Sequence, residues 1–182
     1  MSAELLRDAE TRMKKSLEAA ANDFSTLRTG RANAAILDSV KVEYYGQPMT
    51  IASVAAVSVP ESRTLLIAPW EKNMLGPIEK AILKSDLGLN PNNDGQNIRL
   101  NIPPLTEQRR KEFVKQLAGK AEAARVALRN LRRDAIEQYK KDDTNTEDDI
   151  KRAEKDVQKL LDKYIAELEA MHKTKEAELL EV

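Results

Sequence analysis

The sequence predicts an α+β protein: a long antiparallel three-helix bundle with a small inserted α/β domain of β/α/β order. Three stretches place apolar residues three and four positions apart, the heptad pattern of packed helices. Between the first and second of these stretches, apolar and polar residues instead alternate, as they do in half-buried strands. We therefore expect a discontinuous bundle domain over residues 1–30 and 105–182, and an inserted domain over residues 31–104.

The first apolar stretch predicts a helix over residues 3–29. Ser2 can cap its start, and Gly30 is expected to end it, because glycine adopts the left-handed conformation without steric cost. The apolar seam of this helix consists of Leu6, Ala9, Met13, Leu17, Ala20, Phe24 and Leu27.

The other two stretches predict helices of about 35 residues, each about 50 Å long at 1.5 Å per residue. Thr106 is the expected N-cap of the second helix, and Thr146–Asp149 has the pattern of a capping box at the start of the third. Because the linker over residues 141–145 is short and polar, the two helices should pack antiparallel. Their seams run from Val114 to Ala135 and from Ile150 to Met171.

The inserted segment predicts several strands and one helix. Strands are expected over residues 40–44, 51–59, 64–68 and 98–102, with turns at Gly46-Gln47-Pro48 and at Pro60-Glu61-Ser62. The helix is expected over residues 77–87, with Gly88 as its stop. A glycine lies at the first junction with the bundle, and two prolines lie at the second. We therefore expect a hinge at 30–31 and 103–105, formed by Gly30, Arg31, Pro103, Pro104 and Leu105.

The composition excludes several kinds of catalytic site. The chain has 182 residues, no cysteine and one histidine, so disulfides, thiol nucleophiles and multi-histidine metal sites are ruled out. His172 is expected to be a surface histidine near a helix C-terminus. The six glycines are too dispersed for a phosphate-binding loop. Residues 90–95 resemble the start of a calcium loop but lack its later carboxylate, so we interpret them as a connector. We predict no catalytic residue, no metal and no cofactor.

The N-terminus is charged from its first residues, and no apolar run reaches about 18 residues, the length of a membrane-spanning helix. Secretion and membrane insertion are therefore not expected, and we predict a cytoplasmic protein. The thirty basic and thirty acidic residues cancel overall. Within the chain, residues 105–141 hold 11 basic and 5 acidic groups, whereas residues 142–182 hold 7 and 13. The second helix is thus basic and the third acidic.

The basic signal of the second helix is concentrated in arginines. Arg125, Arg129 and Arg132 have helical spacing that aligns them, and Arg133 lies beside them. Arginine can bind phosphate with two parallel hydrogen bonds, so this arginine edge is a candidate nucleic-acid contact. Alternatively, the arginines pair with acidic groups of the third helix or are simply solvated. Arg28 and Arg31, around Gly30, are further candidates, unless they only interact with the end of the first helix.

Several segments together resemble the bacterial ribosome recycling factor family over essentially the whole chain. The segments that carry the resemblance, in order, are Leu27–Ala32, Val42–Gly46, Ser85–Asn92, Pro103–Glu107 and Ala124–Asp134. The resemblance implies an L-shaped protein in which the inserted domain is joined to the bundle by a flexible elbow. It also implies a monomer that is not an enzyme.

Members of this family bind the ribosome after termination, at the large-subunit site vacated by tRNA, and split it together with elongation factor G and GTP. The resemblance therefore implies 23S rRNA and elongation factor G as partners, and neither membrane nor DNA. Five arginines match family positions implicated in contacting large-subunit RNA: Arg28, Arg31, Arg129, Arg132 and Arg133. Arg125 is added from its spacing alone. The alternative function is that of a helical-bundle adaptor that binds a partner protein helix.

Overall fold

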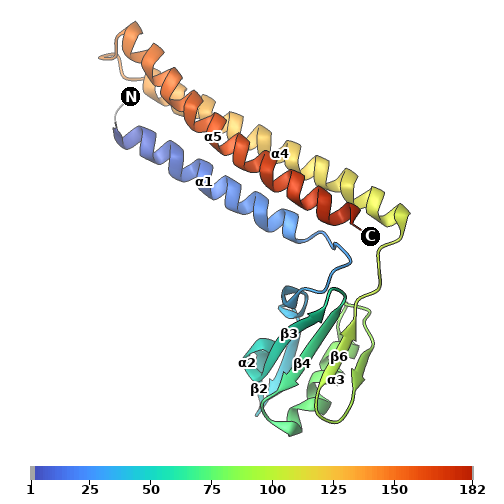
Figure 1. Ribbon diagram of the computed structural model, residues 1–182. Coiled ribbons are helices and arrows are strands. Elements are labelled where there is room, and N and C mark those ends of the chain that lie inside the picture. The colour runs from blue at the N-terminus through green and yellow to red at the C-terminus, as the bar shows by residue number, and fades with distance from the viewer. Residues whose placement is uncertain (1–2, 182) are drawn as a thin grey trace. The chain divides into compact units, whose positions relative to one another are not determined.

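The computed structural model describes residues 3–181, and its fold is drawn in Figure 1. The chain divides into two compact units: residues up to Thr29 together with those from Thr106 onward, and Gly30–Leu105. The first unit is a bundle of three long helices, and the second contains all the strands. The predicted fold class, a helical bundle with an inserted α/β domain, is confirmed. Ser2, the expected first N-cap, lies outside the described residues.

The bundle consists of α1 (Ala3–Ser25), α4 (Glu107–Lys140) and α5 (Glu147–Leu180). Figure 1 shows all three helices lying side by side. Its core is formed mainly by predicted heptad positions, to which the structure adds Ile136 and Leu179. The large residues with the least exposure are Met13, Leu117, Leu128, Leu168 and Leu179. Each of these side chains is at most 1% exposed, so the three apolar seams cover one another.

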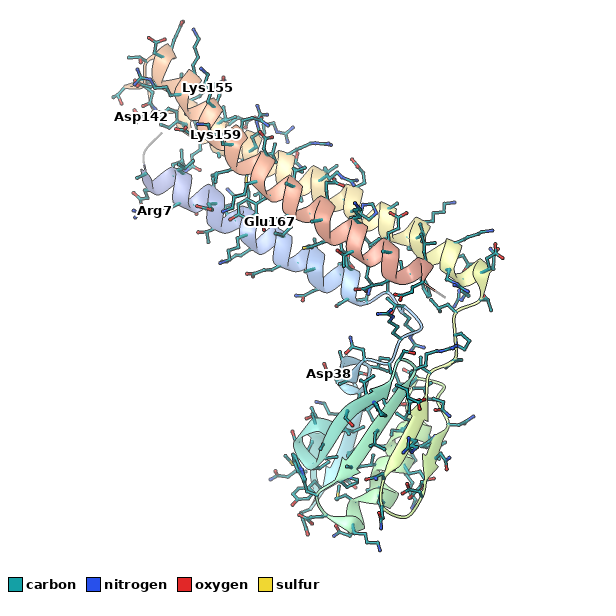
Figure 2. All side chains as sticks on the ribbon, viewed as in Figure 1. Arg7, Asp38, Asp142, Lys155, Lys159 and Glu167 are labelled. Atoms are coloured by element: carbon teal, nitrogen blue, oxygen red, sulfur yellow. The ribbon has the colours of Figure 1, made fainter. Side chains whose placement is uncertain are left out.

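The two long helices begin at the predicted caps. The Thr106 hydroxyl accepts a hydrogen bond from the Arg109 amide at 3.2 Å. Thr146 and Asp149 form a capping box, in which each side chain accepts from the other residue's backbone N–H. The loop between α4 and α5 is closed by Asp142 (Figure 2), whose carboxylate accepts from the Thr144 amide at 3.0 Å. These contacts satisfy helix ends that would otherwise lack partners.

The first helix ends earlier than predicted. It stops at Ser25 rather than at residue 29, and Gly30 is five residues beyond its end. The Ser25 hydroxyl donates to the Asn22 carbonyl at 2.6 Å, and the Thr26 hydroxyl donates to the Asp23 carbonyl at 2.7 Å. These hydroxyls satisfy carbonyls in the last turn, which favours an end at this point. Leu27 is still 5% exposed, so its apolar character reflects burial outside the helix.

The second unit contains a hairpin and an antiparallel sheet. The hairpin pairs β1 (Lys41–Tyr44) with β2 (Gln47–Thr50). The four-stranded sheet has the order β3-β4-β6-β5 and consists of β3 (Ala55–Glu61), β4 (Thr64–Pro69), β6 (Ile98–Asn101) and β5 (Pro91–Asn93). Two α-helices, α2 (Ile51–Val54) and α3 (Leu75–Lys84), and two 3₁₀ turns, Ala34–Leu37 and Lys72–Met74, complete it. Its core is a single cluster that includes Val42, Ile51, Leu65, Ile67, Ile78, Ile98 and Leu100.

Two predicted strand boundaries in this unit are wrong. Ile51–Val54, expected to be extended, forms the helical turn α2, which buries Ile51 and Val54 to 0% and 4% exposure. Residues three apart lie on one side of a helix but on opposite faces of a strand, so only the helix buries both. In addition, β3 continues through Pro60 and Glu61, which the sequence placed in a turn.

The remaining differences concern turns and helix ends. Gln47 and Pro48, expected in a turn, begin β2, and the turn itself is Tyr45-Gly46. Pro91–Asn93, expected to be a connector, is an edge strand, and edge strands are where proline is tolerated in a sheet. The helix expected over 77–87 is α3, Leu75–Lys84, which ends where the Ser85 hydroxyl donates to the Ile82 carbonyl at 2.6 Å.

Candidate nucleic-acid interface

Two of the four candidate arginines on α4, Arg129 and Arg133, are well exposed. The Arg129 side chain is 58% exposed, and its Nη1 atom lies 3.6 Å from Glu122 Oε1. The Arg133 side chain is 65% exposed; its Nη2 atom donates to Asn130 Oδ1 at 3.3 Å. A guanidinium has five N–H donors, so each of these arginines retains donors for a phosphate. Both side chains are therefore available to a ligand outside the bundle.

Arg132 lies between these two in the chain and is half-buried. Its Nε atom is buried and has no hydrogen-bond partner within residues 3–181. Because this atom is buried, it does not face a ligand outside the bundle, and Arg132 belongs to the candidate interface through its position beside Arg129 and Arg133. Arg129, Arg132 and Arg133 are called the arginine triplet below.

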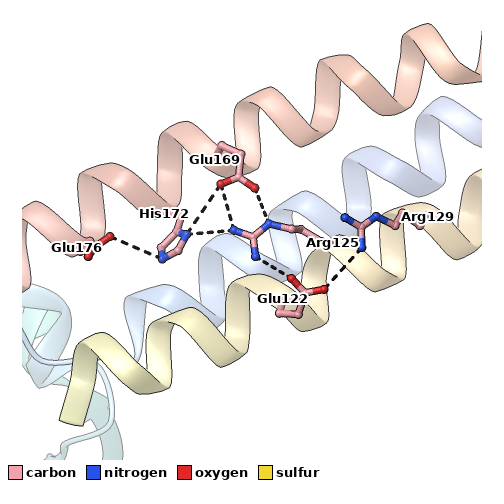
Figure 3. A network of polar contacts seen from close by, with 6 residues as sticks. All are labelled: Glu122, Arg125, Arg129, Glu169, His172 and Glu176. Atoms are coloured by element: carbon pink, nitrogen blue, oxygen red, sulfur yellow. Dashed lines mark hydrogen bonds and ion pairs between the residues drawn. The ribbon is translucent and has the colours of Figure 1, made fainter. Parts of the chain in front are cut away.

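Arg125 differs from the triplet. It is only 18% exposed and donates to Glu169 on α5 from both Nε and Nη2, the latter at 3.1 Å (Figure 3). Its Nη1 atom also donates to Glu122 Oε2 at 2.9 Å. The hydrogen bonds to Glu169 raise the pKa of Arg125, and the same contact lowers the pKa of Glu169. Pairing with an acidic group of the third helix, left open by the sequence, is thus what the structure shows for Arg125.

His172 is not the surface histidine that the sequence predicted. Its side chain is 17% exposed, and its Nδ1 atom lies 3.3 Å from Arg125 Nη2. The carboxylates of Glu169 and Glu176 are each 4.0 Å from its ring nitrogens, and the Phe24 ring of α1 is 6.4 Å away. Helices α1 and α4 therefore both cover it, a packing that the sequence of α5 alone does not reveal.

Arg28 and Arg31 belong to different units. Arg28 is exposed and lies in the bundle unit, three residues beyond the end of α1. Its position weakens the interpretation that it only caps that helix, because the favourable interaction with helix ends falls off within the last turn. Arg31 is exposed and lies in the Gly30–Leu105 unit.

The candidate hinge residues lie just outside two backbone hydrogen bonds, each of which holds one connecting segment to the rest of the small unit. The Ala32 amide donates to the Ser62 carbonyl at 2.8 Å, and the Ile102 amide donates to the Arg63 carbonyl at 2.7 Å. Both connecting segments are thereby fixed to the turn between β3 and β4. Gly30 has a φ of +77°, and a Cβ atom there would lie 3.3 Å from the Leu105 backbone nitrogen. The predicted hinge residues therefore lie outside the two hydrogen bonds that fix residues 32 and 102.

Sequence reasoning missed the residues that hold the arginines. Glu122, which precedes both residues on α4, contacts Arg125 with one carboxylate oxygen and Arg129 with the other (Figure 3). Asn130 holds Arg133. Helical spacing of three, four or seven residues could have indicated both contacts, since such residues are neighbours on a helix surface. Nothing local could have indicated Glu169, which is 44 residues from Arg125.

Replacing Glu169 with glutamine should destabilise the bundle, because it leaves the poorly exposed Arg125 with a weaker partner. We expect a melting temperature about 2–4 °C lower at pH 7, followed by far-UV circular dichroism. The folded-state pKa of Glu169 is lowered, so the stabilisation is fully present above the ordinary value of 4.5 and is lost as the pH falls through the lowered value.

The difference between the wild type and Glu169→Gln should therefore shrink below about pH 4.5. Glu137→Gln is the matched control, since Glu137 lies 4.0 Å from Arg133 within α4 and both of these side chains are 65% exposed. A difference that stays constant down to pH 3 would contradict this role of the Arg125–Glu169 pair.

No helix within residues 3–181 combines the length and the apolar character that crossing a membrane requires. The same residues contain no group of three histidine, cysteine, aspartate or glutamate side chains arranged to hold a metal ion.

Comparison with known proteins places the chain among translation factors. A model of the ribosome recycling factor family matches residues 20–180. The ribosome-recycling factor of Caldicellulosiruptor bescii is 56% identical over 183 residues, which cover 99% of this chain and 100% of that relative. A solution structure of the ribosome recycling factor is similar with a TM-score of 0.80 and 42% identity, over 98% of this chain and 97% of that one.

A second solved structure describes the Thermus thermophilus ribosome recycling factor and the Escherichia coli elongation factor G bound to the E. coli post-termination complex. It is similar with a TM-score of 0.66 and 46% identity, over 98% of each chain. The chain belongs to the ribosome recycling factor family. The resemblance found in the sequence is confirmed.

Proposed function

We propose that this chain binds the post-termination ribosome and, together with elongation factor G and GTP, splits it into subunits in the cytoplasm. Membership of the family supports this proposal, as does the related factor that is bound with elongation factor G to a post-termination complex. The observation that carries it is the arginine triplet on α4, in which the exposed Arg129 and Arg133 lie beside the half-buried Arg132.

The triplet provides the contact with the 23S rRNA of the large subunit. Folded RNA presents phosphates at fixed positions, and bidentate hydrogen bonds from arginine recognise them without reading sequence. Binding of this kind needs positive charge in the correct place rather than a basic protein, which is compatible with a net charge of zero. Arg28 and Arg31 add contacts near the linker, whereas Arg125 supports α4 through Glu169.

Splitting requires the two units to move relative to each other. Gly30, Arg31, Pro103, Pro104 and Leu105 act as the hinge, while each unit stays rigid. The hydrogen bonds of Ala32 and Ile102 to the β3–β4 turn support this proposal, because they confine the change of backbone dihedrals to a few residues.

The buried apolar seams of the bundle argue against the adaptor alternative. An adaptor would offer an open apolar seam to a partner helix, but Leu117, Leu128 and Leu168 are each at most 1% exposed. An adaptor would also bind independently of salt, because apolar contacts release no counterions.

Co-sedimentation with purified large ribosomal subunits over a range of salt concentrations tests the proposed contact. We expect binding whose affinity falls linearly with salt on a double-logarithmic plot, with a slope of about −0.7 for each phosphate contacted. Small subunits are the control and should bind more weakly. Binding to large subunits that does not change with salt would reject the RNA contact.

A further inference from the structure

Tyr45 has an unusual backbone conformation. Its φ is +47°, and among residues 3–181 it is the only residue other than glycine with a positive φ. With Gly46, whose φ is +80°, it forms the two-residue turn between β1 and β2. A turn with two positive φ values favours asparagine, aspartate or glycine, and an aromatic residue there is strained. Backbone strain of this kind is often found where a side chain has a function.

The side chain of Tyr45 is both exposed and fixed. It is 76% exposed, the largest exposed fraction of any large apolar side chain in the described part of the chain. Its hydroxyl nevertheless donates to Glu71 Oε2 at 3.0 Å, and its ring packs edge-on against Tyr44 at a centroid distance of 4.5 Å. Tyr44 donates to the other oxygen of Glu71. The ring is thus held in one orientation before any partner arrives, which lowers the entropic cost of binding.

The neighbouring carboxylate determines which ligand this ring suits. The hydrogen bonds from Tyr44 and then Tyr45 lower the pKa of Glu71, so its negative charge persists at neutral pH. Each of its oxygens accepts one of these bonds and retains a second lone pair. A negative charge beside an aromatic ring repels phosphate and attracts a cation, and arginine can stack on the ring while its N–H groups reach the carboxylate.

We propose that Tyr45, supported by Tyr44 and Glu71, is a docking site for an arginine side chain of a partner protein. The site lies on the β1–β2 hairpin of the small unit, whereas the arginine triplet lies on the bundle, so it adds a protein contact to the RNA contact proposed above. Tyrosine and arginine are both enriched among the residues that dominate the energy of protein interfaces.

Tyr45→Asn separates a docking role from a structural one. Asparagine tolerates the positive φ, so the melting temperature should stay the same or rise. The rate of ribosome splitting with elongation factor G, an assay that rests on the proposed function, should fall about tenfold, as expected for the loss of one dominant interface residue. Val59→Asn is the control: it removes a 45% exposed apolar side chain from β3, outside the β1–β2 hairpin, and should change neither quantity. Unchanged splitting by Tyr45→Asn would overturn the proposal, and so would a loss that accompanies a lower melting temperature.

A second measurement does not depend on splitting. The photo-crosslinker p-benzoylphenylalanine is placed at position 45, and the protein is irradiated on purified post-termination ribosomes with elongation factor G. We expect a crosslink to a protein, mapped to a peptide that contains an arginine. Crosslinks to rRNA alone, or no crosslink although the protein co-sediments with the ribosomes, would overturn the proposal. A wild type that docks in this way but does not split ribosomes would contradict the proposed function and leave the docking site intact.

Discussion

Replacing Arg129, Arg132 and Arg133 together with alanine will weaken binding to large ribosomal subunits by about a hundredfold or more, since each hydrogen bond to a charged group contributes about 1.5–3 kcal/mol. The fold should be retained, because two of the three side chains are exposed and the third has a buried Nε atom without a partner. The salt dependence should also flatten by about two units of slope, or about 0.7 for each lost phosphate contact.

The matched control removes three positive charges from another helix. Lys155, Lys159 and Lys173 are exposed on α5, and Figure 2 labels the first two. Their triple alanine variant has the same net charge as the triplet variant, so a general loss of electrostatic attraction would weaken both equally. Binding that weakens in the control as much as in the triplet variant would contradict a contact through the triplet. Co-sedimentation with large subunits at several salt concentrations measures both quantities.

Gly30→Val should damage splitting far more than binding. A β-branched residue resists the φ of +77°, and its Cβ atom would lie 3.3 Å from the Leu105 backbone nitrogen and 3.4 Å from its Cγ atom. The two connecting segments must then change their path. We expect the splitting rate at saturating protein to fall about tenfold, in line with backbone strain of 1–3 kcal/mol, while the affinity for large subunits changes less than about twofold.

Gly88→Val is the control for strain alone. Gly88 also has a positive φ, +65°, and lies in the small unit, but a Cβ atom there would meet nothing within 4 Å. It carries a similar backbone cost without disturbing Leu105. The hinge proposal predicts that it splits ribosomes at nearly the wild-type rate. If Gly30→Val loses binding and splitting to the same extent, Gly30 serves folding or binding rather than movement.

The long helices could be predicted because their signals are local and repeated. Heptad spacing determines which residues are buried, and Thr106 and Thr146 cap their helices through residues three positions away. The end of α1 was predicted less well, because the heptad pattern continues through Leu27. The hydroxyls of Ser25 and Thr26, rather than Gly30, mark its end.

The small unit was harder to predict because its elements are short. The segment Ile51–Val54 begins and ends with a β-branched residue, as a strand often does, but its helical turn is what buries both of these residues in the core. The edge strand Pro91–Asn93 has neither apolar alternation nor β-branched residues, and it is defined by its pairing with β6.

In the candidate site, too, the contacts between near neighbours could be predicted and the contacts between distant residues could not. The alignment of Arg129, Arg132 and Arg133 follows from helix geometry, so the sequence was sufficient to bring them together. The different role of Arg125 depends on Glu169 and His172, which are 44 and 47 residues away and reach it only through the packing of α5 on α4.

Light scattering of purified post-termination 70S ribosomes tests the central claim most directly. The ribosomes are mixed with this protein, elongation factor G and GTP, and the scattered intensity is followed as the subunits separate. We predict a fall in scattering that requires all three additions. A preparation that co-sediments with the ribosomes but produces no fall, or a fall of equal rate without this protein, would contradict the claim that the chain splits ribosomes.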